Sequence, residues 1–440
     1  NWAEWRTRPE NIVAPGIPLS HISLMSQKPA GHTTRALRAL KNKLANQGGS
    51  ATEWHRLGEL LLRERRSEEA LEALRHAVEL APDNTRLLSG LAHALSLNRR
   101  YEEAISIRRS FEQLNGRDIA ALADDLRYAQ DFAGALALVD EAESQGRAIP
   151  AAKFVRGLAR LFSGQYADGF ADMEHRFEAG LAKRPLKVPL KEWNGHVRPD
   201  LRLLVYPDQG LGDDIMMLRF LKPLEAAGVN ATFLARSPLD RLLRASAIGA
   251  RVESVLEDVS SFDACCAVNS LPHLLEAGAA PPPPVALKVP QSSLAFGAGM
   301  TSFHPDALKI GICWTGSPTY PRNAMRSISP RLFEALARRD AVVLYSLCHG
   351  ETAGEPAREG MDGLIINACE KADFADTAGL INALDLVIST DTALVHLAAS
   401  LGKPVWNLLP QEGIWQYGVG GGGTPWYPGM RLFRQQSRGD

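Results

Sequence analysis

The stretch DLVISTDTALVHLAASLGKPVWNLL (residues 385–409) decides how the second half of the chain folds. Its first six residues form a short apolar run, which is typical of a buried strand. A helical stretch follows, and PVWNLL (residues 404–409) is another short apolar run. A strand, a helix and a strand in this order predict two parallel strands in one doubly wound sheet.

The same alternation extends outward from this stretch toward the N-terminus. Further strands are predicted at residues 201–206, 230–235, 251–256, 262–268, 309–314, 341–347 and 363–368. The segment AAPPPPVALKVP (residues 279–290) contains four consecutive prolines, so it predicts a stiff linker that divides these strands into two sets. We therefore expect two Rossmann-like halves, in which ligands bind at the carboxyl ends of the strands.

The region from residue 51 to about residue 180 repeats itself at steps of 34 and 31 residues. The residues that fit the tetratricopeptide-repeat pattern in the first unit are Trp54, Leu57, Gly58, Ala70 and Pro82. The second helices of the later units are expected to begin at Tyr101, Phe132 and Tyr166. About four helix pairs are predicted.

Small residues at helix contacts let antiparallel helices approach closely, so this pattern predicts a solenoid with a concave face. These small residues are Gly58, Ala70, Ala92, Ala104, Ala135 and Gly169. An ordinary helical bundle is the alternative. The positions expected to line the concave groove are His55, Glu59, Arg86 and His93. For these four residues, a solvated face without a ligand is the alternative.

The composition, with 45% apolar and 22% charged residues, is that of a soluble globular protein, and 440 residues suggest about three domains. The net charge of −1 gives no basic field, so we expect no nucleic-acid partner. The predicted parts are an N-terminal arm and helix (residues 1–50), the repeats (51–183), a first Rossmann-like domain (184–290) and a second (291–440).

Cysteine content and hydropathy narrow the class of protein further. Five cysteines without a C-x-x-C pair indicate neither a disulfide framework nor a zinc site. No run approaches 18 uninterrupted apolar residues, and NWAEWRTRPENI (residues 1–12) is too charged for a signal peptide. We therefore expect a cytoplasmic protein without a membrane span. Four prolines before residue 30 predict an extended arm, and one helix is expected at residues 33–48.

QGLGDD (residues 209–214) joins the first predicted strand to a helix. Glycines in such a turn let the backbone approach a ligand closely, so we expect Gln209, Gly210 and Gly212 to form a ligand-facing loop. The loop is neither a G-x-G-x-x-G motif nor a Walker A motif. Asp213 is a candidate general base, and a helix-capping carboxylate is the alternative.

Two segments of the second half carry groups suited to an anionic ligand. The candidates in the first segment are Trp314, Gly316, Ser317, Asn323 and Arg326, and those in the second are Asp391, Thr392, Ala393 and His396. Arginine binds phosphoryl oxygens in bidentate fashion, and a helix N-terminus favours negative charge. The alternatives are a solvated arginine, a plain N-cap aspartate and a core histidine. No D-x-D motif stands at a strand end, so no metal is expected.

The GLGD loop, the segment WTGSP…RNAMRSIS, the stretch of residues 373–406 and the closing TPWYPGMRLFRQ together resemble the bacterial tetratricopeptide-repeat glycosyltransferases. Their catalytic part is similar to the family 9 heptosyltransferases and, more distantly, to O-GlcNAc transferases. The resemblance covers roughly residues 51–435. It implies an N-terminal repeat solenoid followed by a GT-B fold of two Rossmann-like domains.

The resemblance also implies roles for single residues. Asp213 would deprotonate the acceptor hydroxyl, and Arg326 would hold the donor phosphate. Asp391, Thr392 and His396 would line the donor pocket with the backbone of Ala393. Two segments depart from the family pattern, SLCHG (residues 346–350) and GVGGGG (residues 418–423), and both lie near the expected donor site.

These implications lead to one principal hypothesis and two alternatives. The hypothesis is a metal-independent, inverting glycosyltransferase that moves a sugar from a nucleotide sugar to a Ser or Thr hydroxyl of a protein bound by the repeat groove. The resemblance includes flagellin glycosyltransferases that use activated nonulosonic acids, so flagellin is one candidate acceptor. The alternatives are a transferase for a lipid or polysaccharide acceptor and a non-catalytic repeat scaffold with a decayed GT-B part.

Overall fold

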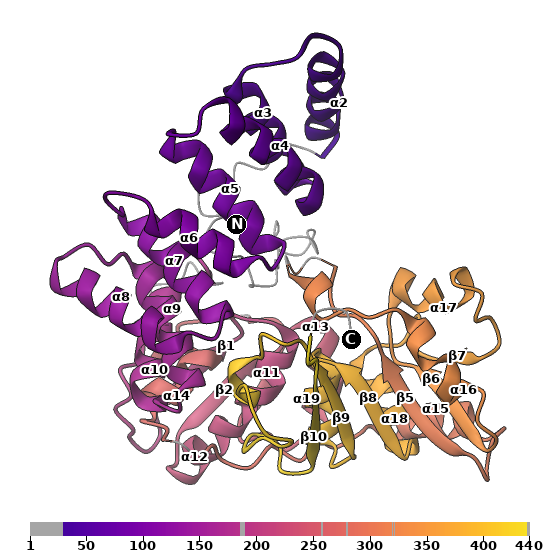
Figure 1. Cartoon of the computed structure of the whole chain (residues 1–440). Helices are drawn as coiled ribbons and strands as arrows, with labels where there is room; N and C mark the ends of the chain where they lie inside the picture. Colours follow the sequence, from indigo (N-terminus) through magenta and orange to yellow (C-terminus); the bar gives the residue numbers. More distant parts are fainter. Residues whose placement is uncertain are drawn as a thin grey trace. The chain divides into compact units, whose positions relative to one another are not determined.

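The computed structural model describes residues 30–184, 190–256, 258–278, 280–318, 320 and 322–437, with side chains from residue 35 onward. Its contacts divide these residues into a helical unit, which extends to Leu181, and an α/β unit, which begins at Ala182 (Figure 1). Within the described ranges, none of the helices combines the length and the hydropathy needed to cross a bilayer.

The helical unit begins with one helix and continues with four helix pairs. Helix α2 spans Ala30–Gln47, and the prediction placed it at residues 33–48. The pairs are α3 (Ala51–Arg63) with α4 (Ser67–Leu80), α5 (Thr85–Leu97) with α6 (Tyr101–Arg109), α7 (Gly116–Tyr128) with α8 (Phe132–Ser144), and α9 (Pro150–Phe162) with α10 (Tyr166–Met173). The expected repeats and the expected helix starts at Tyr101, Phe132 and Tyr166 are confirmed.

Side-chain size at the helix contacts explains this packing. A Cβ atom at Gly58 would lie 2.4 Å from Cγ of Leu74, so only glycine lets α3 and α4 approach this closely. The predicted small residues Ala70, Ala92 and Ala104 are completely buried. The turn inside each pair also repeats, with a positive φ at Arg65, Arg99, Gln130 and Gly164.

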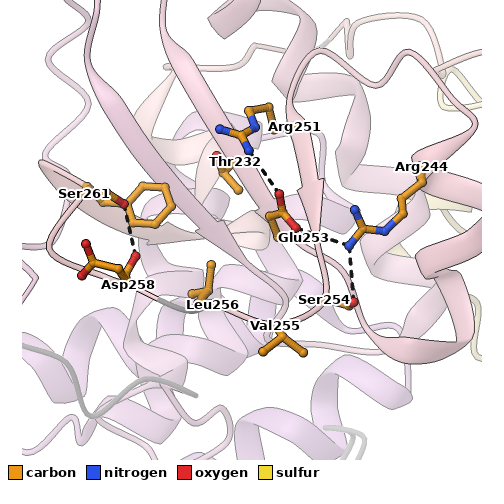
Figure 2. A pocket seen from close by; sticks show the side chains of 10 residues that line it. Thr232, Arg244, Arg251, Glu253, Ser254, Val255, Leu256, Asp258 and Ser261 are labelled. Atoms are coloured by element: carbon orange, nitrogen blue, oxygen red, sulfur yellow. Dashed lines mark hydrogen bonds and ion pairs between the residues drawn. The ribbon is translucent and has the colours of Figure 1, made fainter.

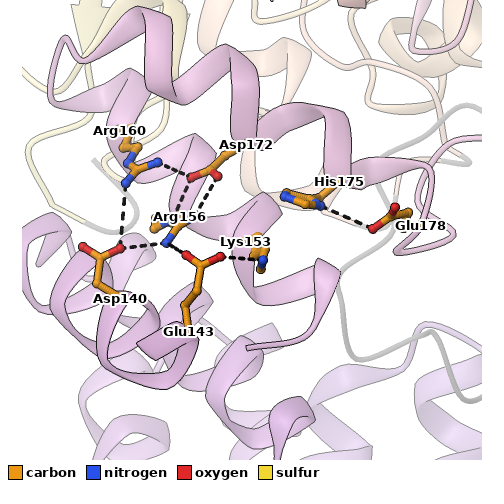
Figure 3. A network of polar contacts seen from close by, with 8 residues as sticks. All are labelled: Asp140, Glu143, Lys153, Arg156, Arg160, Asp172, His175 and Glu178. Carbon is orange, nitrogen blue, oxygen red and sulfur yellow. Dashed lines mark hydrogen bonds and ion pairs between the residues drawn. The ribbon is translucent and has the colours of Figure 1, made fainter. Parts of the chain in front are cut away.

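A charged network joins the last three helices of this unit (Figure 3). The guanidinium group of Arg156 on α9 donates to both carboxylate oxygens of Asp172 on α10, over 2.7 and 2.8 Å. It also donates to Asp140 on α8, over 2.8 Å, and Arg160 adds a 2.7 Å contact to Asp172. Because Arg156 and Asp172 are both buried, each needs the other to offset the loss of solvation.

We expect the Arg156→Ala variant to lose roughly 3 kcal/mol of unfolding free energy, because Asp172 would keep a buried charge with fewer partners. Hydrogen exchange of α8, α9 and α10, followed as urea increases, measures this loss. Arg66→Ala is the matched control, since Arg66 pairs with Glu69 on the surface and exposed pairs contribute little. Equal losses in the two variants would contradict a stabilising role for the network.

The α/β unit contains two parallel sheets. The first has the order β3-β2-β1-β4, with β1 at Arg202–Tyr206, β2 at Asn230–Leu234, β3 at Arg251–Glu253 and β4 at Ala264–Ala267. The second has the order β10-β9-β8-β5-β6-β7. Its strands are β5 (Leu308–Cys313), β6 (Val342–Ser346), β7 (Ile365–Asn367), β8 (Leu386–Thr390), β9 (Val405–Leu409) and β10 (Met430–Arg434). The two Rossmann-like halves are therefore present.

All nine predicted strands form, and β10 is an additional strand that the sequence analysis missed. Strand β3 is shorter than predicted, because the chain leaves the sheet after Glu253. Strand β10 pairs in parallel with β9, but Arg431 and Phe433 point to solvent, so MRLFR lacks the continuous apolar character of a central strand.

Helices connect the strands of both sheets. They are α11 (Leu211–Met217), α12 (Leu221–Ala226), α13 (Ser237–Arg244), α14 (Leu271–Leu274), α15 (Gln291–Thr301), α16 (Glu334–Ala337), α17 (Glu355–Arg358), α18 (Phe374–Ala383) and α19 (Ala393–Ser400). The proline-rich segment leads into α15, which packs so closely on α18 that a Cβ at Gly297 would lie 2.1 Å from the Gly379 carbonyl oxygen. The chain thus enters the second half at α15.

Candidate functional site

The first turns of α11 and α19 touch at one glycine, and this contact places the carboxyl ends of β1 and β8 near each other. A Cβ atom at Gly212 would lie 2.8 Å from Cδ2 of His396 and 3.1 Å from Cα of Ala393. The site is therefore assembled where the two Rossmann-like halves meet. This agrees with the rule that ligands of such sheets bind beyond the carboxyl ends of the strands.

Asp213 stands in the first turn of α11. One carboxylate oxygen accepts a 2.9 Å hydrogen bond from the Gly210 N–H, so the expected capping interaction is present and the second oxygen stays available. Burial raises the pKa of Asp213 to about 6, and the negative charges of Asp391 and Asp208 add to this effect against the lowering effect of the Gly210 bond. A carboxylate with such a pKa suits proton transfer near neutral pH.

Two further aspartates, Asp208 and Asp214, lie at the two ends of this loop, and the sequence analysis did not select them. Asp214 is fully buried and forms an ion pair with Arg236 over 3.1 Å, and Arg236 also donates to the Gln209 carbonyl oxygen. Asp208 accepts a 2.8 Å hydrogen bond from the Asn269 side chain. These contacts fix the backbone of the QGLGDD loop. The adjacency of Asp213 and Asp214 in the sequence did not reveal which of them is paired.

Arg326 lies across the loop that follows β5. Its guanidinium group occupies the space above Gly316, where a Cβ would be 2.5 Å from Nη2, and it stacks 4.5 Å from the ring centre of Tyr320. Asn323 orients the group, because its side-chain oxygen accepts from Arg326 Nε over 3.2 Å and from the Gly316 N–H over 3.2 Å. The predicted residues Gly316, Asn323 and Arg326 are thus brought together.

Asp391 completes this cluster from the end of β8. Its carboxylate lies 3.4 Å from Nη1 of Arg326, and burial raises its pKa although Arg326 and Tyr417 favour the charged form. The interpretation of Asp391 as a plain N-cap is wrong, because Thr392 is the residue that caps α19, accepting from the Leu394 N–H over 3.2 Å. Asp391 is therefore free to act on Arg326.

Three residues predicted to bind the donor, Trp314, Ser317 and His396, have environments that differ from those of the Arg326 cluster. The Trp314 side chain is buried and its indole N–H donates to Glu355 over 2.5 Å, so this ring supports the loop from inside. Ser317 is exposed. His396 is buried, with Nδ1 3.1 Å from the Tyr427 hydroxyl and Nε2 3.5 Å from the Tyr417 hydroxyl. The side chains of Trp314 and His396 thus face protein groups rather than an open donor surface.

Sequence reasoning missed Arg219, Tyr417 and Tyr427. Arg219 is buried, and it donates to the carbonyl oxygens of Trp426, over 2.9 Å, and Pro282, over 3.0 Å. It thereby connects the first half to the C-terminal segment. The only signal in the sequence was the TPWYP string, which was used for the resemblance and not for a role.

The two segments that depart from the family pattern have structural explanations. In SLCHG, the Cys348 thiol lies 3.6 Å from the Cys313 thiol, and His349 Nε2 lies 3.0 Å from the Thr377 hydroxyl. In GVGGGG, Gly418 and Gly421 have φ of 64° and 77°, which favour glycine. The Arg434 guanidinium donates to four carbonyl oxygens of this loop and of Tyr417.

The four groove candidates of the helical unit have different environments. His55 is buried and packs against Gly90, where a Cβ would lie 2.8 Å from its Nε2. Its Nδ1 is 3.9 Å from Glu59. Glu59 and His93 are half-buried and Arg86 is exposed. His55 therefore acts as a packing residue, whereas Glu59 and Arg86 offer surface to a partner.

A groove of 480 Å³ lies at the β2–β3 side of the first sheet, and Asp213 and Asp391 do not line it (Figure 2). Its charges are satisfied internally, because Glu253 contacts both Arg244 and Arg251 and the Asp258 carboxylate accepts from the N–H and the hydroxyl of Ser260. We therefore place the functional site at the loop ends. Among the residues that the structure describes, no three His, Cys, Asp or Glu side chains gather into a possible metal site.

We expect Gly212→Ala to destabilise the α/β unit by about 1–3 kcal/mol, because a new methyl group would overlap His396 and Ala393. Urea unfolding, read as hydrogen exchange of α11 and α19, measures the effect. The matched control is Gly299→Ala in α15, where a Cβ meets open space and alanine favours the helix. Unchanged protection in Gly212→Ala would contradict the close approach of the two helices.

Comparisons with known proteins agree with this description. Residues 331–409 match the model of glycosyltransferase family 9 (heptosyltransferase), and residues 61–107 match a tetratricopeptide-repeat model. Protein FlbA of Caulobacter vibrioides is 27% identical over 489 residues, which cover 95% of this chain and 81% of that protein.

Two solved structures are similar to parts of this chain. A family 9 glycosyltransferase of Veillonella parvula matches with a TM-score of 0.42 and 14% identity over 55% of this chain and 88% of its own. ADP-heptose lipopolysaccharide heptosyltransferase II of E. coli matches with a TM-score of 0.40 and 15% identity over 53% of this chain and 90% of its own. The two family matches support a glycosyltransferase that carries a tetratricopeptide-repeat region together with a region that matches glycosyltransferase family 9.

Proposed function

We propose that this glycosyltransferase moves a sugar from a nucleotide-sugar donor to a Ser or Thr hydroxyl of a protein acceptor that the repeat region recruits. The observation that supports this most is the placement of Asp213 and the Arg326–Asp391 pair at the same meeting point of the two halves. Glycosyl transfer requires both a base for the acceptor hydroxyl and a positive group for the departing phosphate.

Asp213 is the proposed base. Its pKa of about 6 keeps the carboxylate ionised at neutral pH, yet basic enough to accept a proton as the acceptor oxygen attacks the sugar carbon. The Gly210 N–H holds one oxygen in place, so the other is the proton acceptor. Because Asp391 is engaged with Arg326, one carboxylate acts as base and none as nucleophile, which favours single displacement with inversion.

The donor side is proposed to consist of Arg326 with the loop of Gly316 and Asn323. The guanidinium group can pair with two phosphoryl oxygens, and Asn323 and Tyr320 already hold its plane. Thr392 and the backbone N–H of Ala393 at the start of α19 add positive potential beside it. In this proposal the negative charge of the leaving nucleotide is balanced by protein groups, without a metal ion.

The repeat region is proposed to select the acceptor, since stacked helix pairs present an extended surface for a polypeptide. A partner of positive and polar character is expected near Glu59, and an acidic one near Arg86. Flagellin is the first acceptor to test, on the strength of the sequence resemblance. A cytoplasmic location is part of this proposal.

The decisive experiment offers UDP-, GDP-, ADP- and CMP-sugars to the full-length protein and analyses the products by mass spectrometry. We expect Asp213→Asn to lower transfer about 10²- to 10⁴-fold, because its amide can still accept from Gly210 but cannot take a proton. Asp258→Asn in the separate groove of Figure 2 is the matched control and should retain full activity.

Each outcome of that experiment decides a part of the proposal. Sugar found on lipid or polysaccharide instead of protein would overturn the protein acceptor. Full turnover in Asp213→Asn would overturn the base. Absence of both binding and turnover with every donor would leave only the scaffold alternative.

The rate of sugar transfer should depend on pH, because Asp213 must be ionised to accept a proton from the acceptor hydroxyl. A carboxylate with a raised pKa is protonated at low pH, so we expect kcat/KM to fall about tenfold per pH unit below about pH 6. The negative charge of Asp208 raises the pKa of Asp213, and Asp208→Asn removes this charge. The fall of kcat/KM should therefore occur at a lower pH in this variant. If the pH at which kcat/KM falls is the same in Asp208→Asn as in the unmodified protein, the titrating group is not Asp213.

A further inference from the structure

Two buried thiols meet at the carboxyl ends of neighbouring strands, and the proposed mechanism uses neither of them. Cys313 is the last residue of β5, and Cys348 lies two residues beyond the end of β6. The Cys348 thiol donates a hydrogen bond to the Cys313 sulfur over 3.6 Å. The two residues are 2% and 4% exposed. Sulfur atoms this close to each other can form a bond once one of them is oxidised.

The backbone at this point is compatible with a disulfide. Strands β5 and β6 pair in parallel, with Ile312 opposite Ser346, and the Leu347 N–H donates to the Ile312 carbonyl oxygen over 2.9 Å. Neighbouring strands lie about 4.8 Å apart, and the Cα atoms of a disulfide are typically about 5.5–6 Å apart. Cys313 and Cys348 come directly after these paired residues. A bond between them therefore requires the side chains to turn, without a shift of the strands.

The Cys313 thiol is also connected to the loop that holds Arg326. It donates to the carbonyl oxygen of Thr315 over 3.2 Å. The Thr315 hydroxyl accepts from the side-chain amide of Asn323 over 2.9 Å. The oxygen of that amide accepts from Nε of Arg326 over 3.2 Å. Contacts through two residues thus lead from Cys313 to the guanidinium group that is proposed to hold the donor phosphate.

Oxidation of the thiol pair would change this connection in two ways. A disulfide has no S–H group, so the Thr315 carbonyl oxygen would lose its donor. The sulfur atoms of a disulfide lie about 2 Å apart, so the Cys313 side chain would also move toward Cys348. Thr315 would then have one contact fewer to hold its position. Because the Thr315 hydroxyl orients the Asn323 amide, the contact between Asn323 and Arg326 would weaken.

We propose that peroxide converts Cys313 and Cys348 into a disulfide that weakens donor binding at Arg326. One peroxide molecule first oxidises one thiol to a sulfenic acid and releases water, and the second thiol then displaces water from this sulfenic acid. Two S–H bonds and the O–O bond break, and one S–S bond and two O–H bonds form. The sulfur atoms are oxidised and the peroxide oxygens are reduced. The effect on the donor rests on the proposed function of Arg326.

Burial of the pair determines which oxidant can act on it. Both thiols are shielded from a bulky reagent such as glutathione disulfide, whereas hydrogen peroxide is little larger than water. The chain returns to the surface directly after Cys348, because His349 is half-buried and Gly350 is exposed. Local opening of this turn is enough to admit peroxide.

The first test detects the disulfide and needs no donor. Full-length protein is treated with hydrogen peroxide, its free thiols are alkylated in denaturant, and its peptides are analysed by mass spectrometry without reduction. We expect one linked pair of peptides, which contain Cys313 and Cys348 and separate in dithiothreitol. Sulfinic acids on unlinked peptides, or a link from Cys313 to another cysteine, would overturn the proposal. A link formed by glutathione disulfide but not by peroxide would overturn the assigned oxidant.

The second test compares donor KM before and after peroxide, with whichever of the UDP-, GDP-, ADP- or CMP-sugars the untreated protein uses. We expect an increase of about tenfold, the equivalent of one weakened hydrogen bond to a charged group, and a smaller change in kcat. Cys348→Ala cannot form the disulfide, so its KM should stay the same in peroxide. Cys348→Ser, which is closer in volume, should behave in the same way.

Cys265→Ala is the control for these variants. Cys265 is also a buried thiol, but it lies on β4 in the first half. Its removal should leave donor KM as sensitive to peroxide as in the unmodified protein. If peroxide raises the KM of Cys348→Ala as much as that of Cys265→Ala, the effect comes from another residue and the proposed regulation is wrong.

The two tests separate this inference from the proposed function. If the untreated protein uses no nucleotide sugar, the proposed function fails, and the linked peptides still decide whether Cys313 and Cys348 form a disulfide. If the disulfide forms and donor KM does not change, the effect on Arg326 is wrong, while sugar transfer by the untreated protein still supports the proposed function.

Discussion

The contact of Gly212 with Ala393 and His396 is the constraint on which the candidate site depends. Any side chain at position 212 would meet the first turn of α19 within 2.8 Å. Because this position is glycine, the loop after β1 and the helix after β8 can touch, and Asp213 lies within electrostatic reach of Asp391. A wider separation would keep the proposed base and the proposed phosphate-binding group from acting on one substrate.

Burial of charge at this contact then determines the chemistry. Asp214, Arg236 and Arg219 are buried and paired with protein groups, so they anchor the loops and are not available for a substrate. Burial raises the pKa of both Asp213 and Asp214, but Asp213 has no ion-pair partner among the described residues and keeps one carboxylate oxygen without a hydrogen bond. The difference between Asp213 and Asp214 is therefore one of pairing: the same residue type becomes a candidate base in one position and an anchor in the next.

The packing of the helical unit is more local, because each helix pair of a repeat solenoid contacts mainly the neighbouring pairs. Small residues set the distance within a pair, as Gly58 against Leu74 illustrates, and the charged network around Arg156 ties the last helices together. Arg156 and Asp172 are buried partners and contribute to stability, whereas Glu59 and Arg86 remain accessible to a polypeptide. The residues that pack this unit are thus different from those proposed to bind an acceptor.

Within the part of the chain that the structure describes, the sequence by itself determined the four helix pairs, nine of the ten strands and the loops that carry Asp213, Arg326 and Asp391, because periodicity, prolines and glycines act locally. Only the tertiary structure decided that Thr392 caps α19, that Trp314 and His396 face protein groups, that Tyr417 and Tyr427 lie beside His396, and that Arg219 contacts the C-terminal segment. Those roles arise from contacts between residues up to 207 positions apart, as for Arg219 and Trp426, and no local pattern encodes such contacts.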